Sequence, residues 1–186
     1  MYWRRIAPGW QQWPRSGVRW NEAGEGRGMF LGEYEHTLDR VGRVSVPARF
    51  RIELGEKVVI SRGFEGCLYV HPADSYREFL ADVLEGSDFD PKYAKVRRFF
   101  ATRAVESNVD KSGRVNLPQA YRDHAGLAGK VVVAGNVDRI ELWDADRWAE
   151  MCAVIDAEAE GLAQEIARER HQSGASGAGV TTPSGR

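Results

Sequence analysis

Residues 39–47 read Asp-Arg-Val-Gly-Arg-Val-Ser-Val-Pro, and residues 110–118 read Asp-Lys-Ser-Gly-Arg-Val-Asn-Leu-Pro. Both stretches keep Asp, Gly, Arg, Val and Pro at the same spacing, and an arginine follows each proline at the same distance, Arg51 and Arg122. A match of this length within one chain indicates an internal repeat. The repeat decides the fold, because each copy is expected to form the same supersecondary unit.

The correspondence continues beyond these stretches after a slip of one residue. The further matched pairs are Gly63 with Gly135, Leu68 with Ile140, Asp74 with Asp146, and Tyr76 with Trp148. The repeat therefore covers nearly the whole of residues 30–155. We expect a first unit over 29–99 and a second over 100–155.

Each copy predicts the same elements in the same order. Alternating and β-branched runs predict strands, and the proline after the second strand suits the first turn of a short helix. The predicted strands are 34–38, 43–46, 57–60 and 67–70 in the first unit, and 105–109, 114–117, 130–133 and 140–143 in the second. The sequence therefore predicts a mainly β fold with flanking helices, of the α+β class.

A longer helix is expected to close each unit, with Asp74 and Asp146 as the N-caps. Apolar residues recur at helical spacing in both helices and predict buried faces. The predicted buried residues are Tyr76, Phe79, Leu80 and Val83 in the first helix, and Trp148, Met151, Cys152, Ile155, Leu162 and Ile166 in the second. A linking helix over 91–103 carries most of the clustered basic residues, which are Lys92, Lys95, Arg97, Arg98 and Arg103.

Both ends of the chain lack such patterns. Residues 1–28 hold four of the six tryptophans and no sustained helix or strand period. We interpret this segment as a disordered leader or a start codon assigned too early, with an extra nucleic-acid contact as the alternative. Residues 156–186 are expected to extend the last helix and to end in a disordered Gly/Ser-rich tail.

Composition excludes several classes of protein. The net charge is −1, so any DNA-binding surface has to arise from local clustering. The two cysteines lie far apart, and the four histidines show no ligand spacing, so neither a disulfide framework, a metal site nor a cofactor is predicted. Each histidine is interpreted as a surface or turn residue. The chain shows no membrane segment and no constellation of an acid, a base and a nucleophile, so we expect neither an enzyme nor a small-molecule substrate.

The repeated Asp-x-x-Gly-Arg motif carries the chemistry. The Asp can accept hydrogen bonds from backbone N–H groups inside the turn, and the Gly permits a left-handed conformation. The Arg then leaves the turn at a fixed angle, where it can contact guanine or phosphate. The alternative is that Asp39 with Arg43, and Asp110 with Arg114, only form ion pairs that lock the two turns.

From Met29 the sequence Met-Phe-Leu-Gly-Glu-Tyr-Glu-His-Thr-Leu-Asp-Arg-Val-Gly-Arg-Val-Ser-Val-Pro-Ala-Arg-Phe resembles the opening of the bacterial MraZ family. The second Asp-x-x-Gly-Arg copy and residues 139–143, Arg-Ile-Glu-Leu-Trp, are similar to that family too. The resemblance spans residues 29–150. It implies two tandem swapped-hairpin units of the SpoVT-AbrB type, shared with AbrB and MazE-like proteins, which form a double-split β-barrel in a ring-shaped homo-oligomer.

The resemblance also implies a function. Members of the family are transcriptional regulators that bind short direct repeats upstream of the division and cell-wall gene cluster. We therefore expect a cytoplasmic, nucleoid-associated regulator that binds double-stranded DNA and represses its own operon. The alternative is a protein-binding module, either antitoxin-like or a scaffold. The candidate DNA-binding residues are Asp39, Arg40, Gly42, Arg43, Asp110, Lys111, Gly113 and Arg114.

Overall fold

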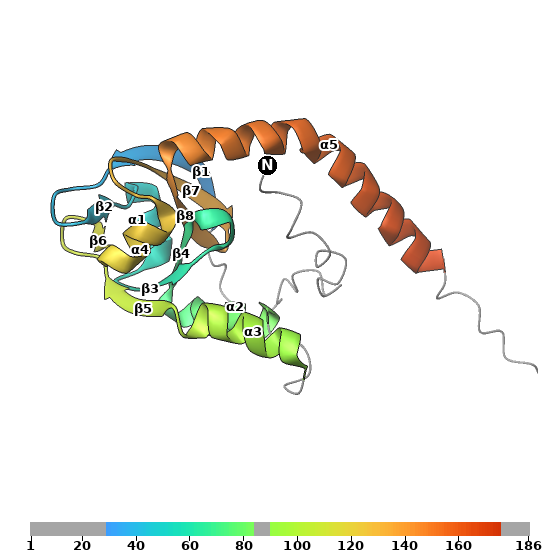
Figure 1. Cartoon of the computed structure of the whole chain (residues 1–186), viewed down its shortest axis with the longest axis horizontal. Helices are drawn as coiled ribbons and strands as arrows, with labels where there is room; N and C mark the ends of the chain where they lie inside the picture. Colours follow the sequence, from blue (N-terminus) through green and yellow to red (C-terminus); the bar gives the residue numbers. More distant parts are fainter. Residues whose placement is uncertain (1–28, 84–89, 176–186) are drawn as a thin grey trace, which may run out of the picture. The chain divides into compact units, whose positions relative to one another are not determined.

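The computed structural model describes residues 29–83 and 90–175 (Figure 1). The predictions for the leader, and for the tail beyond residue 175, lie outside these residues. The first repeat contributes β1 (Phe30–Thr37), β2 (Arg43–Ser45), α1 (Ala48–Leu54), β3 (Lys57–Arg62), η3 (Phe64–Gly66), β4 (Leu68–Pro72) and α2 (Ala73–Val83). Then follow α3 (Pro91–Ala101), β5 (Ala104–Asn108), β6 (Arg114–Asn116), α4 (Gln119–Ala125), β7 (Lys130–Val137), β8 (Arg139–Asp144) and α5 (Ala145–Ala175).

The two repeats exchange strands. The larger sheet has the order β1-β7-β8-β4-β3-β5, and a second sheet pairs β2 with β6. Strand β1 of the first repeat lies antiparallel to β7 of the second, while β5 of the second lies antiparallel to β3 of the first. The repeats consequently share one body, and the predicted α+β class is confirmed. The chain divides into this body, which ends at Asp144, and a second unit that contains α5.

Local chemistry explains where the elements begin. Pro47 and Pro118 lie at the N-cap positions of α1 and α4, one residue earlier than predicted. Asp74 lies inside the first turn of α2 rather than at its cap, where its negative charge still complements the helix dipole. Asp90 caps α3, because its Oδ1 accepts a hydrogen bond of 2.8 Å from the backbone N–H of Lys92.

The apolar core draws on both repeats. Val44 of β2 faces Val115 of β6 across the short sheet, and each side chain is 1% exposed. Phe50 of α1 packs edge to face against Phe30 and Tyr34, with ring centroids 5.5 and 5.2 Å apart. The core cluster combines buried residues of both repeats, and the pair Val44 and Val115 joins one repeat to the other, so neither repeat has a complete core of its own.

His71 corrects the interpretation that every histidine lies at the surface. Its side chain is fully buried on β4, with its ring centroid 4.5 Å from that of Phe79. Both ring nitrogens are buried without a hydrogen-bond partner in the described part of the chain. Burial, followed by the positive charge of Arg139, lowers the pKa of His71 to about 3. The imidazole is therefore neutral at physiological pH.

Helix α5 departs from the prediction in another way. Ile155, Leu162 and Ile166 share one stripe but are 47, 50 and 51% exposed, so the predicted burial of these three residues is wrong for the single chain. Helical spacing identified the apolar stripe but says nothing of what covers it. Across residues 29–83 and 90–175, the helices are too short or too polar to cross a bilayer.

Candidate nucleic-acid interface

The first Asp-x-x-Gly-Arg turn is held by its own aspartate. Asp39 Oδ1 accepts hydrogen bonds from the backbone N–H groups of Val41 and Arg43, at 3.0 and 2.9 Å. Asp39 Oδ2 accepts a third from Arg43 Nε at 2.8 Å. Gly42 has a φ of +85°, a backbone conformation that side chains with a Cβ rarely adopt. The carboxylate therefore fixes both the turn and the direction in which Arg43 leaves it.

The second turn repeats this geometry. Asp110 Oδ1 accepts from the backbone N–H groups of Ser112 and Arg114, both at 2.9 Å, and Asp110 Oδ2 accepts from Arg114 Nε at 3.0 Å. Gly113 has a φ of +74°. The sequence repeat thus becomes a structural repeat down to individual hydrogen bonds.

The two turns lie side by side at one end of the body, beyond β2 and β6 (Figure 1). The backbone N–H of Val46 donates to the Gly113 carbonyl, and the N–H of Leu117 donates to the Gly42 carbonyl, both at 2.8 Å. Oppositely charged groups also approach across the pair: Arg43 Nη1 lies 3.8 Å from Asp110 Oδ2, and Arg114 Nη1 lies 3.9 Å from Asp39 Oδ2. The turns therefore form one rigid unit.

Two further arginines brace the turns reciprocally. Arg51 of α1 donates from Nε to the Val46 carbonyl at 2.8 Å, and Arg122 of α4 donates to the Leu117 carbonyl at 3.0 Å. A Cβ placed on Gly42 would lie 2.8 Å from Arg122 Cζ, and one placed on Gly113 would overlap the guanidinium of Arg51. Each repeat thus covers the glycine of the other repeat's turn. Sequence reasoning identified both arginines as repeat anchors without assigning them this role.

Exposure divides the charged residues of the turns into two groups. The paired side chains Asp39, Arg43, Asp110 and Arg114 are 31–35% exposed. Backbone N–H donors, chiefly those of Arg43 and Arg114, lower the pKa values of Asp39 and Asp110, so both carboxylates stay charged at neutral pH.

Arg40 and Lys111 are exposed at the turns. The ion pairs of the alternative interpretation, Asp39 with Arg43 and Asp110 with Arg114, are also present. Because the formal charges of the four paired residues cancel, the positive charge of the tips comes from Arg40 and Lys111. The structure brings all eight predicted residues to this one end of the molecule.

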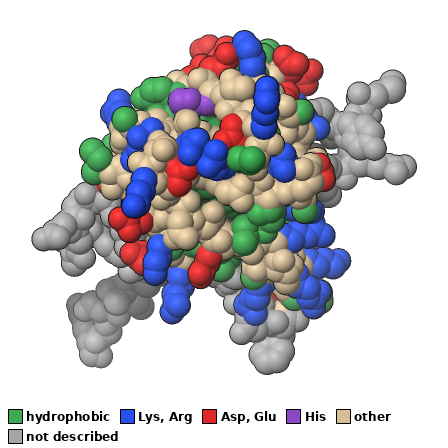
Figure 2. Space-filling model, turned by 90° about the vertical axis from the view of Figure 1, so that its left-hand side faces the viewer, with side chains coloured by type: hydrophobic (Ala, Val, Ile, Leu, Met, Phe, Trp, Pro, Cys, Tyr) green, Lys and Arg blue, Asp and Glu red, His purple; other side chains and the backbone are tan. Residues whose placement is uncertain are grey.

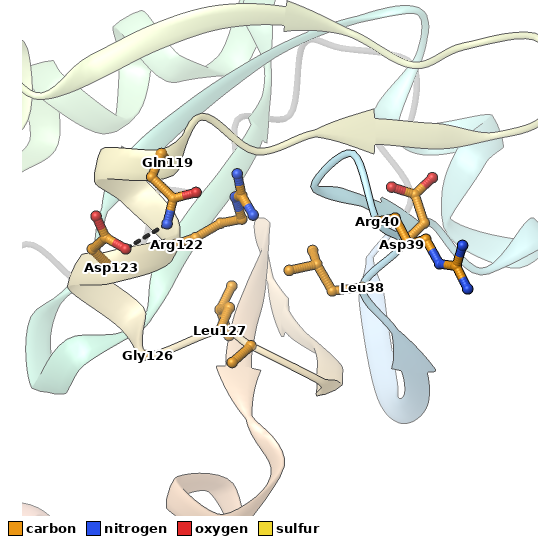
Figure 3. A pocket seen from close by; sticks show the side chains of 9 residues that line it. Leu38, Asp39, Arg40, Gln119, Arg122, Asp123, Gly126 and Leu127 are labelled. Carbon is orange, nitrogen blue, oxygen red and sulfur yellow. Dashed lines mark hydrogen bonds between the residues drawn. The ribbon is translucent and has the colours of Figure 1, made fainter.

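An open pocket of about 650 Å³ lies beside the first turn (Figure 3). Asp39 and Arg40 lie on one side of the pocket, and Gln119 and Asp123 of α4 lie on the other. Gln119 Nε2 donates a hydrogen bond of 2.6 Å to Asp123 Oδ1. Leu38 is drawn between the two sides. The pocket separates the exposed Arg40 from α4, so Arg40 lies at the edge of the turn.

Figure 2 views the body from the end that carries the turns. Lys and Arg side chains are scattered over this face among acidic and hydrophobic side chains, and they gather again at its lower edge, the edge at which Figure 1 places α3. Within residues 29–83 and 90–175, no three His, Cys, Asp or Glu side chains are grouped as a metal site would need. The features of this face are paired turns and exposed cations.

Comparison with known proteins places this architecture in a family. The model of the family described as "MraZ protein, putative antitoxin-like" matches residues 29–99 and again residues 100–169. The chain belongs to the MraZ family. Proteins named transcriptional regulator MraZ resemble it in Moorella thermoacetica, at 41% identity over 74% of this chain and 96% of the relative, and in Lactobacillus johnsonii, at 36% over the same shares. The one from Ligilactobacillus salivarius is 43% identical over 64% of this chain and 84% of the relative.

Membership in the MraZ family confirms the resemblance that the repeated motif and its flanking residues indicated. The relatives are named as regulators rather than as enzymes, which agrees with the expectation that the chain has no catalytic function. The two matched segments of the MraZ model meet between residues 99 and 100, at the end of α3.

Proposed function

We propose that the chain is a sequence-specific DNA-binding transcriptional regulator, and that its two Asp-x-x-Gly-Arg turns contact the duplex together. The observation that carries this proposal is a pair of rigid, adjacent and matching turns that expose Arg40 and Lys111 at one end of the body. A rigid turn loses little conformational entropy on binding, so its contacts contribute more fully to affinity.

The paired arginines suit a role closer to the bases. Arg43 and Arg114 each commit Nε to an aspartate, which orients the plane of the guanidinium. About one third of each side chain remains exposed. An oriented guanidinium can make a bidentate contact with guanine in the major groove, while Arg40 and Lys111 supply the contacts to phosphate. Pairing with Asp and reading of DNA are thus compatible functions of the same arginines.

The finer features of the regulator belong to the same proposal. We infer that the chain assembles into a homo-oligomeric ring of double-split β-barrel units and binds direct repeats upstream of the division and cell-wall gene cluster. It would then repress its own operon, in the cytoplasm at the nucleoid. Membership in the MraZ family and the strand exchange between repeats support this proposal. Several turns on one oligomer would raise the affinity for spaced sites through effective concentration.

The test is binding of the full chain to a labelled duplex from upstream of its own gene, with a shuffled duplex as the reference. Fluorescence anisotropy at several salt concentrations gives the number of phosphate contacts. Replacing Arg40 and Lys111 together with Ala should reduce the slope of log K against log salt by about 2, since each phosphate contact contributes about 0.9. Arg77→Ala removes one exposed charge from α2 and serves as the control, because it should leave the slope unchanged.

Equal affinity for the upstream and shuffled duplexes would contradict sequence-specific binding. An unchanged salt slope in the double variant would contradict the assignment of Arg40 and Lys111. The alternative is an antitoxin-like or scaffold protein, and the family description itself contains the word "antitoxin-like". It predicts that the variant loses a protein partner and that neither duplex binds in a salt-dependent manner.

A further inference from the structure

The two turns share one backbone geometry but differ at their apex. Val41 and Ser112 occupy the matching position, and each backbone N–H donates to Oδ1 of the aspartate two residues earlier, at 3.0 and 2.9 Å. Val41 is 62% exposed, and Ser112 is exposed as well. One tip therefore ends in two methyl groups, while the other ends in a hydroxyl.

Nothing in the turn itself needs a valine. Ser112 forms the same hydrogen bonds, and serine is a favoured turn residue, whereas β-branched residues are favoured in strands. Val41 also stands apart from the buried core cluster of the body. A single exposed aliphatic side chain is ordinary on a protein surface, so exposure alone assigns no function to Val41. Its position in the turn carries the argument. Val41 lies at the apex of a turn, between the exposed Arg40 and the braced Gly42.

The chemistry of the major groove supplies a partner for this side chain. Thymine is the base that presents a methyl group there, at C5, and apolar side chains make contact with it. We propose that Val41 packs against the C5-methyl group of one thymine, while Ser112 makes a polar contact at the matching position of the second turn. Val41 is then a specificity-determining residue. This inference rests on the proposed DNA-binding function and deepens it.

Neighbouring charge favours DNA over a protein partner for Val41. The adjacent Arg40 is exposed, and the charges of Arg43 and Asp39 offset each other, so the surroundings of Val41 carry net positive charge. A polyanion matches that surface better than a second copy of the same basic tip does. Because the two tips differ in chemistry, one chain would read a base sequence without dyad symmetry, despite the pseudo-symmetry of its backbone.

The test removes the methyl group from the DNA and leaves the base pairing intact. The full chain first selects its preferred duplex from a random pool, and each thymine of that duplex is then replaced singly with deoxyuridine. Loss of one buried methyl contact should weaken binding about fourfold, on the scale of one buried carbon. We expect this effect at one thymine of each site that a chain occupies. Methylating C5 of a cytosine placed there should restore part of the affinity.

Variants at the apex assign the effect to a side chain. Val41→Ser should bind the thymine and deoxyuridine duplexes equally, and it should fold normally because serine already occupies the matching turn. Ser112→Val should create a second position that is sensitive to the methyl group. Thermal unfolding of both variants checks that the turns remain intact.

The outcomes separate the two levels of the proposal. If the chain selects no duplex, the proposed DNA-binding function fails and this inference falls with it. If a duplex is selected and no single deoxyuridine weakens binding, the inference alone is wrong. It is equally wrong if Val41→Ser keeps the same sensitivity to deoxyuridine as the unaltered chain.

Discussion

Replacing Gly42 with alanine tests how the turns are braced. An alanine at a φ of +85° is strained by about 1–2 kcal/mol. Its Cβ would also lie 2.8 Å from Arg122 Cζ, so the guanidinium has to move away. That movement breaks the hydrogen bond from Arg122 Nε to the Leu117 carbonyl, at a net cost of about 1 kcal/mol. We expect Gly42→Ala to lower the free energy of unfolding by about 2–3 kcal/mol.

A double-mutant cycle separates these two contributions. In an Arg122→Ala background the guanidinium is absent, so Gly42→Ala should cost only the backbone strain of about 1–2 kcal/mol. The coupling energy should then be about 1 kcal/mol, measured by urea unfolding of all four proteins. Gly129→Ala is the matched control, because its φ is not positive and its Cβ would meet nothing within 4 Å. It should leave stability nearly unchanged.

Equal costs of Gly42→Ala in both backgrounds would refute the contact between the arginine and the glycine. A cost below about 0.5 kcal/mol in either background would refute the strained backbone, since ordinary surface substitutions lie within that range. The same variant should also weaken DNA binding, because it disturbs the turn from which Asp39 directs Arg43.

Three other predictions concern the body of the protein. The pKa of His71 falls from 6.5 to about 3 on folding, so the unfolded chain takes up a proton first and stability should decrease as pH falls below 6.5. At pH 5 this loss is about 2 kcal/mol, and it should be missing from His71→Phe; parallel stability curves for the two proteins would contradict it. Phe50→Ala should lower the free energy of unfolding in urea by about 3–5 kcal/mol. Ile52 on the same helix is 83% exposed, so Ile52→Ala should lower it by less than about 0.5 kcal/mol. Similar losses in the two variants would place Phe50 outside the core. Burial raises the pKa of the Cys67 thiol, so iodoacetamide should label it only in the unfolded chain. Mass spectrometry measures the labelling, and rapid labelling under native conditions would disprove the burial.

Local signals in the sequence predicted the elements well because each rests on neighbouring residues. Pro47 and Pro118 located the starts of two helices to within one residue. The spacing of Asp, Gly and Arg predicted the aspartate-held turn, and the ion pair given as the alternative interpretation of the same motif is present beside it. These features depend on interactions within about four residues of the chain, which one copy of the motif already contains.

Long-range partners could not be predicted in the same way. The alternating pattern of β1 indicates a strand, but nothing in it says that the strand pairs with Lys130–Val137. Histidine is a polar residue for which a surface position was expected. The burial of His71 follows from the aromatic side chains that other segments bring to it, such as Phe79. For the same reason, Arg51 could be recognised as part of the repeat but not as the cover of Gly113.

The two repeats keep the same residues at the buried positions of the turns and differ at the exposed apex. Gly42 and Gly113 are both covered by an arginine of the other repeat, so a change in either copy would disturb the brace of both turns. At the apex, Val41 and Ser112 are exposed, so a different side chain there should cost the fold little. A chain that carries both copies can therefore keep one rigid scaffold while its two tips acquire different side chains. Two identical chains in a symmetric dimer cannot do this, because every substitution appears on both tips at once.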